Sequence, residues 1–282
     1  MFSGAVFALH LVFASVVPTA QADAETPPAT VDAPFSNQEM VDIFDSAALP
    51  NLAAVEITPP VTGIEAIDRR LITLAEARGY QARGVASGNL IRVDGYLLQP
   101  AAADAWVALR NAALAEGISI SLTSGYRTPE AQAWLMNREL GGWTTPEINA
   151  ALNLAAPPGY SKHHTGYAID LRSGSNTLYD FADTAAYQWL AADGFANARA
   201  HGWLPSYPDG VEQLGPEPEP WEFVWVGVDE LFCRQASPDA AGPFCDDDRS
   251  ATTCASTMAC PLDSTTKAHF AWLEAPSVLP VR

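Results

Sequence analysis

Apolar residues along this chain follow two periods, one typical of helices and one typical of strands. Apolar spacing predicts helices over 64–78, 104–117 and 184–201. Thr128, as a cap, and Pro129 at the first helical position predict another over 128–140, and at most one short helix is expected near 37–47. Alternation of apolar and polar residues predicts strands over 118–123, 167–171 and 221–226. The apolar stretch 90–99, with Gly95 in its middle, predicts a hairpin or two short strands, and 141–160 is expected to be a long loop. This mixed order of helices and strands is typical of an α+β domain.

The N-terminal residues resemble a signal peptide for export. An apolar run from Ala5 to Val17 precedes the small residues Ala20 and Ala22, which favours a signal peptide over 1–22. No later stretch reaches the roughly 20 apolar residues that a transmembrane helix needs. The following segment, 23–60, is rich in Pro, Ala, Thr and acidic residues and is predicted to be a tether. We therefore expect a protein exported to the periplasm or cell surface, with a folded domain over 61–231.

The charge balance excludes one class of partner. The chain has 15 basic and 33 acidic residues, which give a formal net charge of -18. Such a chain would repel a phosphate backbone instead of releasing its counterions, so nucleic-acid binding is not expected. The 48% of hydrophobic residues is sufficient for a packed core.

All four cysteines lie near the C-terminus, at positions Cys233, Cys245, Cys254 and Cys260. None of them forms the close pairs expected of zinc knuckles or redox motifs. Two disulfides in a C-terminal extension over 232–282 are the better interpretation, and three connectivities are open. Oxidised cysteines agree with export.

A histidine and an aspartate in the middle of the chain are candidates for a metal site. His163 and Asp170 are seven residues apart, and in a straight strand they would lie about 23 Å from each other. They can share a metal only if the chain turns between them, and Thr165–Gly166 is where a turn is sterically easiest. Taken alone, this spacing is a weak signal.

Several motifs in a consistent order strengthen it. The segment Ser161-x-His163-x-x-Gly166-x-Ala168-x-Asp170 resembles the metal-binding motif of the VanY-type D-alanyl-D-alanine carboxypeptidases, which belong with lysostaphin-like and hedgehog-like zinc folds. The similarity covers about 101–227. It continues in three further motifs, which are Ser124-Gly125-Tyr126-Arg127 with Gln132, Ser206-Tyr207-Pro208, and Glu219-Pro220-Trp221.

The resemblance implies a fold and a set of roles. The fold would be a small antiparallel sheet flanked by helices. His163 and Asp170 would bind zinc, Glu219 would act as the general base, and Arg127 would bind or polarise the substrate carbonyl. The substrate would be a peptidoglycan stem peptide, and we expect a monomer. Further substrate contacts are expected from Gln132, Ser124, Tyr126 and Ser161.

The sequence departs from the family's pattern at the third metal ligand. The family has a histidine after Glu-Pro-Trp, whereas this chain has Glu222. Glutamate is a legitimate zinc ligand, but two carboxylates cancel the charge of a dication and shift preference toward harder metals such as Mn²⁺. We predict that Glu222 is the third ligand, with Zn²⁺ or another divalent cation bound. The alternatives are an inactive wall-binding module of the same fold, and cleavage inside a peptide cross-bridge.

Overall fold

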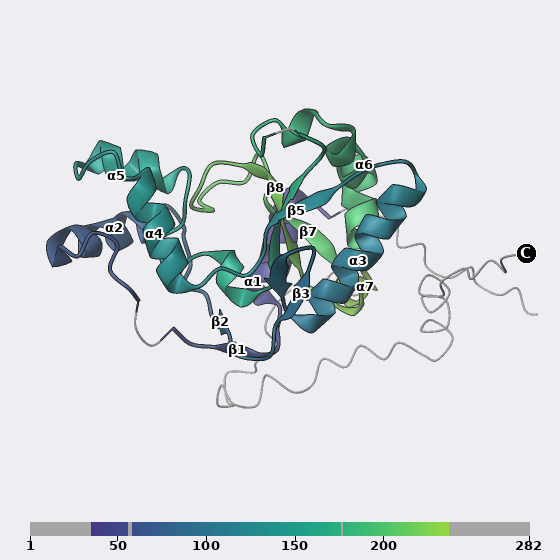
Figure 1. The fold of residues 1–282 in the computed structure, drawn as a ribbon, viewed down its shortest axis with the longest axis horizontal. Coiled ribbons are helices and arrows are strands. Elements are labelled where there is room, and N and C mark those ends of the chain that lie inside the picture. The colour runs from purple at the N-terminus through teal and green to yellow at the C-terminus, as the bar shows by residue number, and fades with distance from the viewer. Residues whose placement is uncertain (1–34, 56–57, 176, 237–282) are drawn as a thin grey trace, which may run out of the picture. The chain divides into compact units, whose positions relative to one another are not determined.

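The computed structural model describes residues 35–55, 58–175 and 177–236 (Figure 1). Its centre is a four-stranded antiparallel sheet with the strand order β5-β6-β8-β7. The strands are β5 (Ser121–Ser124), β6 (Ala168–Arg172), β7 (Trp203–Tyr207) and β8 (Glu219–Trp225). Helices flank this sheet, so the predicted α+β fold with a small antiparallel sheet is confirmed.

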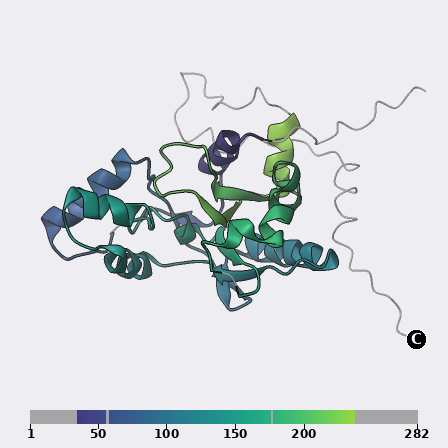
Figure 2. The ribbon, with the colours of Figure 1, turned by 90° about the horizontal axis from the view of Figure 1, so that it is seen from above.

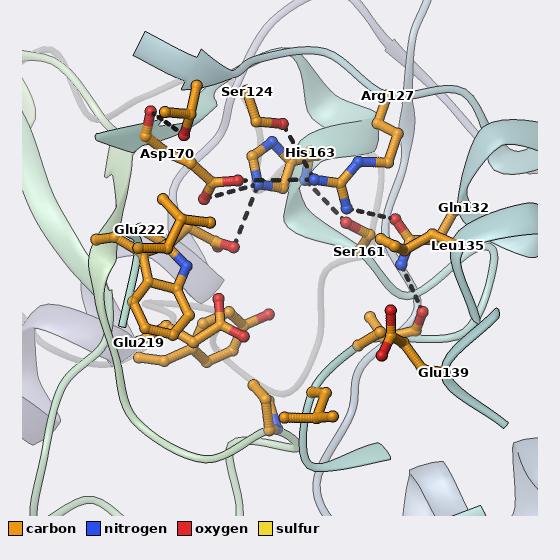
Figure 3. Close-up of a pocket in the computed structure, with 18 of the residues that line it drawn as sticks. Ser124, Arg127, Gln132, Leu135, Glu139, Ser161, His163, Asp170, Glu219 and Glu222 are labelled. Atoms are coloured by element: carbon orange, nitrogen blue, oxygen red, sulfur yellow. Dashed lines mark hydrogen bonds and ion pairs between the residues drawn. The ribbon is translucent and has the colours of Figure 1, made fainter. Parts of the chain in front are cut away.

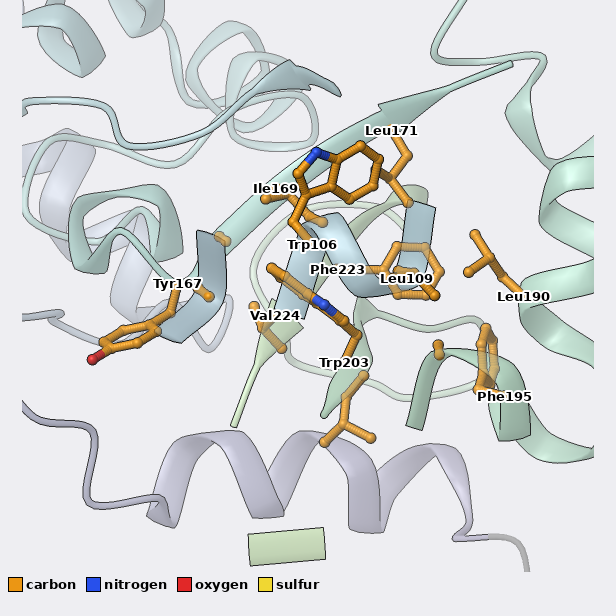
Figure 4. Close-up of a cluster of buried hydrophobic side chains, with 14 of the residues drawn as sticks. Trp106, Leu109, Tyr167, Ile169, Leu171, Leu190, Phe195, Trp203, Phe223 and Val224 are labelled. Carbon is orange, nitrogen blue, oxygen red and sulfur yellow. The ribbon is translucent and has the colours of Figure 1, made fainter. Parts of the chain in front are cut away.

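One face of the sheet carries the main hydrophobic core (Figure 4). Ile169 and Phe223 are cross-strand neighbours on β6 and β8, and both are fully buried. Helices α3 (Pro100–Ala115) and α6 (Ala185–Arg199) contribute Trp106 and Leu190 to the same cluster. Burial of each such side chain stabilises the fold by roughly 1.5–3 kcal/mol. The alternating pattern of β6 and β8 is therefore explained by this core.

A second hydrophobic cluster joins three helices that lie together beside the sheet (Figure 2). These helices are α2 (Glu65–Ala77), α4 (Pro129–Glu139) and α5 (Thr145–Leu152). Leu71, Met136 and Ile148, one from each helix, are fully buried in it. The sequence pattern predicts α2 and α4, but the region of α5 was expected to be a loop, so that expectation is wrong. The start of α5 is set by Thr144, whose side chain forms a capping box with Glu147.

The segment that was predicted to be a tether contributes to the core. Helix α1 (Asn37–Ser46) begins at Ser36, which forms a capping box with Glu39. Its side chains Met40 and Phe44 are buried in the main cluster. Farther along, β1 (Leu52–Ala53) pairs with β2 (Val85–Ala86). The folded unit therefore includes residues before the predicted boundary at 61, because one face of this short helix is apolar enough to be buried.

The remaining elements agree with the sequence in type but differ at their ends. The predicted hairpin is present as β3 (Ile91–Val93) and β4 (Tyr96–Leu98). Helix α3 begins earlier than predicted because Pro100 occupies its first turn. Helix α6 is interrupted around Gly194, where the backbone adopts left-handed conformations. The strand β7 and the helix α7 (Val228–Ala236) were not predicted as elements, and two short 3₁₀ helices complete the fold, η1 (Lys162–Thr165) and η2 (Phe181–Asp183).

Two predictions concern parts of the chain outside the described residues. The predicted signal peptide, 1–22, is one of them, and the expected disulfides are the other, because Cys245, Cys254 and Cys260 lie beyond residue 236. Within the described ranges, every helix is too short or too polar to cross a bilayer.

Candidate metal centre and active site

The register of the sheet brings two acidic residues side by side. Asp170 of β6 is directly opposite Glu222 of β8, and Ser124 of β5 is opposite Asp170 on its other side. Side chains opposite each other in an antiparallel pair have Cβ atoms about 4.5–5.5 Å apart. Since Ile169 and Leu171 point into the hydrophobic core, the pleat directs Asp170 to the other face. This polar row across three strands is the floor of the site.

A short turn of 3₁₀ helix brings His163 back over that row. Ser161 caps η1, and its Oγ accepts a hydrogen bond from the His163 N–H at 3.3 Å. Gly166 then adopts a left-handed conformation with φ of 73°, which favours glycine and redirects the chain into β6. The turn that the sequence required at Thr165–Gly166 is therefore present.

The side chains of His163, Asp170 and Glu222 converge (Figure 3). Each offers one ligand atom, and the three atoms lie within 4.8 Å of one another. His163 Nε2 is 3.3 Å from Asp170 Oδ1 and 3.3 Å from Glu222 Oε2. All three residues are buried, with 2 to 6% of their surface exposed. Burial opposes protonation of His163, but the charges of the two carboxylates outweigh it and raise its pKa to about 9.

The hydrogen bonds around this group leave a place for a cation. His163 Nδ1 donates to the carbonyl oxygen of Gly125 at 2.7 Å, which fixes the ring and directs Nε2 at the two carboxylates. Among the described residues, His163 Nε2 and Asp170 Oδ1 are buried atoms that have no hydrogen-bond partner. A cation bound by one imidazole nitrogen and two carboxylate oxygens would satisfy both atoms. The residues present therefore fit a divalent metal ion.

Glu219 and Glu222, three residues apart on β8, have opposite protonation tendencies. Burial opposes ionisation of Glu222, but the charge of His163 and the hydrogen bond from Ser206 lower its pKa to about 2. Burial, and then the charges of Glu222 and Asp170, raise the pKa of Glu219 well above its usual range. Two neighbouring carboxyl groups with divergent environments are typical of acid–base chemistry.

Arg127 is held against the other side of the metal-binding group (Figure 3). Its Nη1 donates to Gln132 Oε1 at 2.7 Å, and its Nη2 donates to Ser124 Oγ at 3.0 Å. The same Nη2 lies 3.7 Å from Asp170 Oδ2. Gln132 is itself fixed, because its Nε2 donates to the carbonyl oxygen of Ala156 at 2.6 Å. The guanidinium is therefore oriented by three partners before any substrate binds.

These groups line one cavity of about 470 Å³. Its inner wall contains the predicted site residues Ser124, Arg127, Gln132, Ser161, His163, Asp170, Glu219 and Glu222. The sequence identified them from motifs that lie almost a hundred residues apart, and the fold brings them to one place.

Residues 95–228 match the family described as "VanY: D-alanyl-D-alanine carboxypeptidase". This segment, just under half of the chain, is similar to the VanY family. The chain is 31% identical over 128 residues to a D-alanyl-D-alanine carboxypeptidase of Enterococcus faecalis, covering 43% of this chain and 45% of the relative. It is 33% identical over 130 residues to the putative carboxypeptidase YodJ of Bacillus subtilis, covering 45% of each. The chain thus spans about half the length of the curated relatives it matches.

Solved structures resemble this chain at lower sequence identity than these relatives do. One is VanYB in complex with D-alanine-D-alanine, with 25% identity and a TM-score of 0.45, covering 53% of this chain and 83% of the other. Another is a D,D-pentapeptidase VanY in complex with Zn(II), with 23% identity and a TM-score of 0.45, covering 66% of this chain and 93% of the other.

One predicted substrate contact, Tyr126, lies outside the lining of this cavity. Its backbone N–H donates to the carbonyl oxygen of Leu97 at 2.7 Å, which ties this residue to the β4 side of the domain. Tyr126 directly precedes Arg127, which does line the cavity. Because neighbouring residues in an extended segment point in opposite directions, the two side chains do not share one side of the chain.

The second histidine of the motif has a structural role. His164 Nε2 accepts a hydrogen bond from the Gly159 N–H at 3.0 Å, so its Nδ1 carries the proton and donates to the carbonyl oxygen of Arg127 at 2.7 Å. Burial lowers its pKa to about 4, which keeps the ring neutral. Both ring nitrogens are therefore engaged outside the group of three ligand atoms.

Two buried residues of the site, Lys162 and Ser206, were not assigned a role from sequence. Ser206 Oγ donates to Glu222, and Lys162 Nζ donates to the carbonyl oxygen of Ser206. Lys162 directly precedes the predicted ligand His163, and Ser206 begins the motif Ser206-Tyr207-Pro208. These positions, and not the residue types, were the features of the sequence that could have indicated a role in the site.

Proposed function

We propose that this chain is a metal-dependent carboxypeptidase that releases the C-terminal amino acid from peptidoglycan stem peptides. The observation that carries the proposal is the convergence of three ligand atoms within 4.8 Å in a cavity that also contains Arg127 and Glu219. The match of residues 95–228 to the VanY family supports the reaction class, since the family is described as D-alanyl-D-alanine carboxypeptidase.

His163, Asp170 and Glu222 are the residues that would hold the metal, and Zn²⁺ is the ion we propose first. One nitrogen and two oxygen ligands suit Zn²⁺, and the second carboxylate also makes Mn²⁺ acceptable. When bound, such an ion supplies Lewis acidity, which lowers the pKa of a water molecule and polarises a carbonyl group.

The chain's own residues supply the proton transfer and the charge stabilisation. The oxygen of a water molecule adds to the carbonyl carbon of the last peptide bond, and Glu219 accepts the proton that this water loses. Arg127 is oriented to stabilise the negative charge that develops on the carbonyl oxygen. The carbon–nitrogen bond then breaks, and Glu219 returns the proton to the departing amine. The products are a shortened peptide and a free amino acid.

Peptides that end in D-alanine are the proposed substrates, and the periplasm or the cell surface is the proposed location. The support is the family description together with the apolar N-terminal run of the sequence. The family description also favours release of a terminal residue over cleavage inside a cross-bridge. The two are separated by the product, which is either a single amino acid or two peptides.

Metal analysis combined with amino-acid release tests the proposal. Purified protein is loaded with Zn²⁺ or Mn²⁺ and incubated with muramyl pentapeptide and tetrapeptide, and free D-alanine is measured. Release from either peptide, abolished by a chelator and by Glu219→Gln, is the expected result. A folded, metal-loaded sample that leaves every such peptide intact would contradict it.

A second candidate function is wall binding without hydrolysis, and Glu222 is the observation that favours it. A second carboxylate reduces the positive charge that a dication offers to water and substrate. Glu222→His decides between the two: turnover that is absent in the natural chain and gained in the variant would favour the binding module. A natural chain that is active and gains little from the exchange would favour the enzyme.

A further inference from the structure

Lys162 is a buried cation beside the metal-binding group. Only 2% of its surface is exposed. Its Nζ donates to the carbonyl oxygen of Ser206 at 2.7 Å, and it lies 4.0 Å from the ring centroid of Tyr207 and 5.2 Å from that of Phe44. A buried ammonium group is costly unless charges or dipoles compensate it. The carbonyl and the two rings provide part of this compensation, but all three are neutral.

The negative charge nearest to Lys162 through this network is that of Glu222. Ser206 joins the two residues, because its carbonyl accepts from Lys162 and its Oγ donates to Glu222 Oε1 at 2.5 Å. The other oxygen of Glu222, Oε2, is the one that faces His163 at 3.3 Å. Glu222 thus has one oxygen held by Ser206 and one directed at the metal-binding position. Lys162 and Glu222 also attract each other electrostatically.

The charges of the acidic residues in the site show why Glu222 needs a positively charged partner. With neutral His163, the ligands Asp170 and Glu222 together carry two negative charges, which a dication would cancel, and the partly buried Glu219 is a third acid in the same cavity. Arg127 lies near Asp170, at 3.7 Å, on the β5 side of the group. Glu222 lies on the opposite side, where β7 supplies Ser206 and where Lys162 is the buried cation. A histidine at position 222 would bring no charge that required a partner.

We propose that Lys162 is the positioning residue that allows a glutamate to serve as the third metal ligand, acting through Ser206. This inference rests on the proposed function, because it concerns the same metal. Lys162 balances the added negative charge, and Ser206 orients the carboxylate so that Oε2 faces His163. Sequences with histidine at position 222 would have no need of this cation.

A double-mutant cycle tests the pairing, with Zn²⁺ and Mn²⁺ themselves as probes. Lys162→Met is made in the natural chain and in the Glu222→His background, and dissociation constants are measured by competition with a chromophoric chelator. We expect Lys162→Met to weaken metal binding roughly 10–100-fold in the natural chain, as loss of a ligand's supporting partner does. In the Glu222→His background the change should be no more than about twofold, the scatter of uncoupled sites.

Ser206→Ala is the matched variant, which removes a single hydroxyl group. It removes the Oγ that donates to Glu222 but leaves the backbone carbonyl that accepts from Lys162. If Ser206→Ala weakens metal binding in the natural chain but not in the Glu222→His background, the result supports the inference. This holds even if Lys162→Met does not fold. Thermal unfolding of the metal-free variants provides a second readout, since the coupling between Lys162 and Glu222 should also appear without metal.

The failure of this inference differs from the failure of the proposed function. Equal weakening of metal binding by Lys162→Met in both backgrounds would overturn the inference, because it would show a merely structural lysine. No weakening in the natural chain would overturn it as well. A chain that binds metal with the expected coupling but hydrolyses no peptide supports the inference and contradicts the proposed hydrolysis.

Discussion

The two faces of the sheet at β6 and β8 are almost equally buried, yet they achieve burial in different ways. On one face, Ile169 and Phe223 are fully buried and pack within the main hydrophobic core. On the other, Asp170 and Glu222 are 6% and 5% exposed, and Asp170 Oδ1 has no hydrogen-bond partner among the described residues. Adjacent residues of one strand thus serve either the stability of the fold or the binding of a ligand.

The apolar face contributes to the free energy of unfolding, and the polar face contributes to the free energy of metal binding. Packing of apolar side chains stabilises the folded state whether or not a ligand is present. Buried polar atoms without partners are a cost in the unliganded state, and binding of a cation removes that cost. Stability and metal affinity should therefore be separable by substitutions only one residue apart.

Phe223→Ala should have the largest effect on stability. Truncation of a fully buried phenylalanine removes its apolar burial and leaves a cavity, which typically costs about 3–5 kcal/mol of unfolding free energy. Chemical denaturation of the metal-free protein measures it. Metal affinity of the folded protein should stay near that of the natural chain. A loss of affinity comparable to that of a ligand variant would break the proposed separation of the two faces.

Asp170→Asn should act on metal affinity instead of on the stability of the metal-free protein. Removal of a ligand charge should cost more than the roughly 100-fold in metal affinity that loss of an outer hydrogen-bond partner can cost. In the natural chain, excess Zn²⁺ should raise the thermal midpoint, because a ligand that binds only the folded state stabilises it. In the variant this rise should disappear, and addition of a chelator should have no effect. An undiminished metal-dependent rise would count against the assigned site.

Arg127→Lys sharpens the comparison within the polar face, because Arg127 contacts the metal-binding group without belonging to it. The variant keeps the positive charge but loses the fork that bonds both Gln132 and Ser124. Loss of alignment should lower kcat roughly 10–100-fold, with metal affinity almost unchanged. Arg69→Lys, on the exposed surface of α2, is the matched control. An equal loss of metal affinity would instead indicate a structural role.

A polar contact at the edge of the apolar face gives the smallest predicted effect. Asp94 accepts hydrogen bonds from Trp106 Nε1 and from Arg110. Burial opposes its ionisation, but these donors outweigh burial and lower its pKa. The resulting stability is present above the unfolded pKa of Asp94 and is lost as the pH falls through the lower folded pKa. Asp94→Asn should cost about 1 kcal/mol at neutral pH.

The pH dependence separates this charge effect from packing. The difference in unfolding free energy between the natural chain and Asp94→Asn should shrink as denaturation is measured toward acidic pH. A difference that stays constant down to the acid range would show that the side chain's shape, and not its charge, matters at this position.

Local patterns were sufficient for most elements of the fold. The alternation around Ile169 and around Phe223 identified β6 and β8, and the spacing around Trp106 identified α3. The elements that were not predicted have weak local signals. The strand β7 contains Pro205, and α5 has only eight residues, so their conformations depend on neighbours that are distant in sequence. The burial of α1 in the core was missed for the same reason.

The sequence by itself determined the residue types of the site and the turn at Gly166, because both are local: a motif is read along the chain, and only glycine adopts that backbone conformation freely. The tertiary structure decided which of these residues meet. The register of β6 against β8 places Asp170 opposite Glu222, and the neighbouring strand β7 brings Ser206 to the same carboxylate. Cross-strand register depends on packing of the whole sheet, which no local pattern encodes.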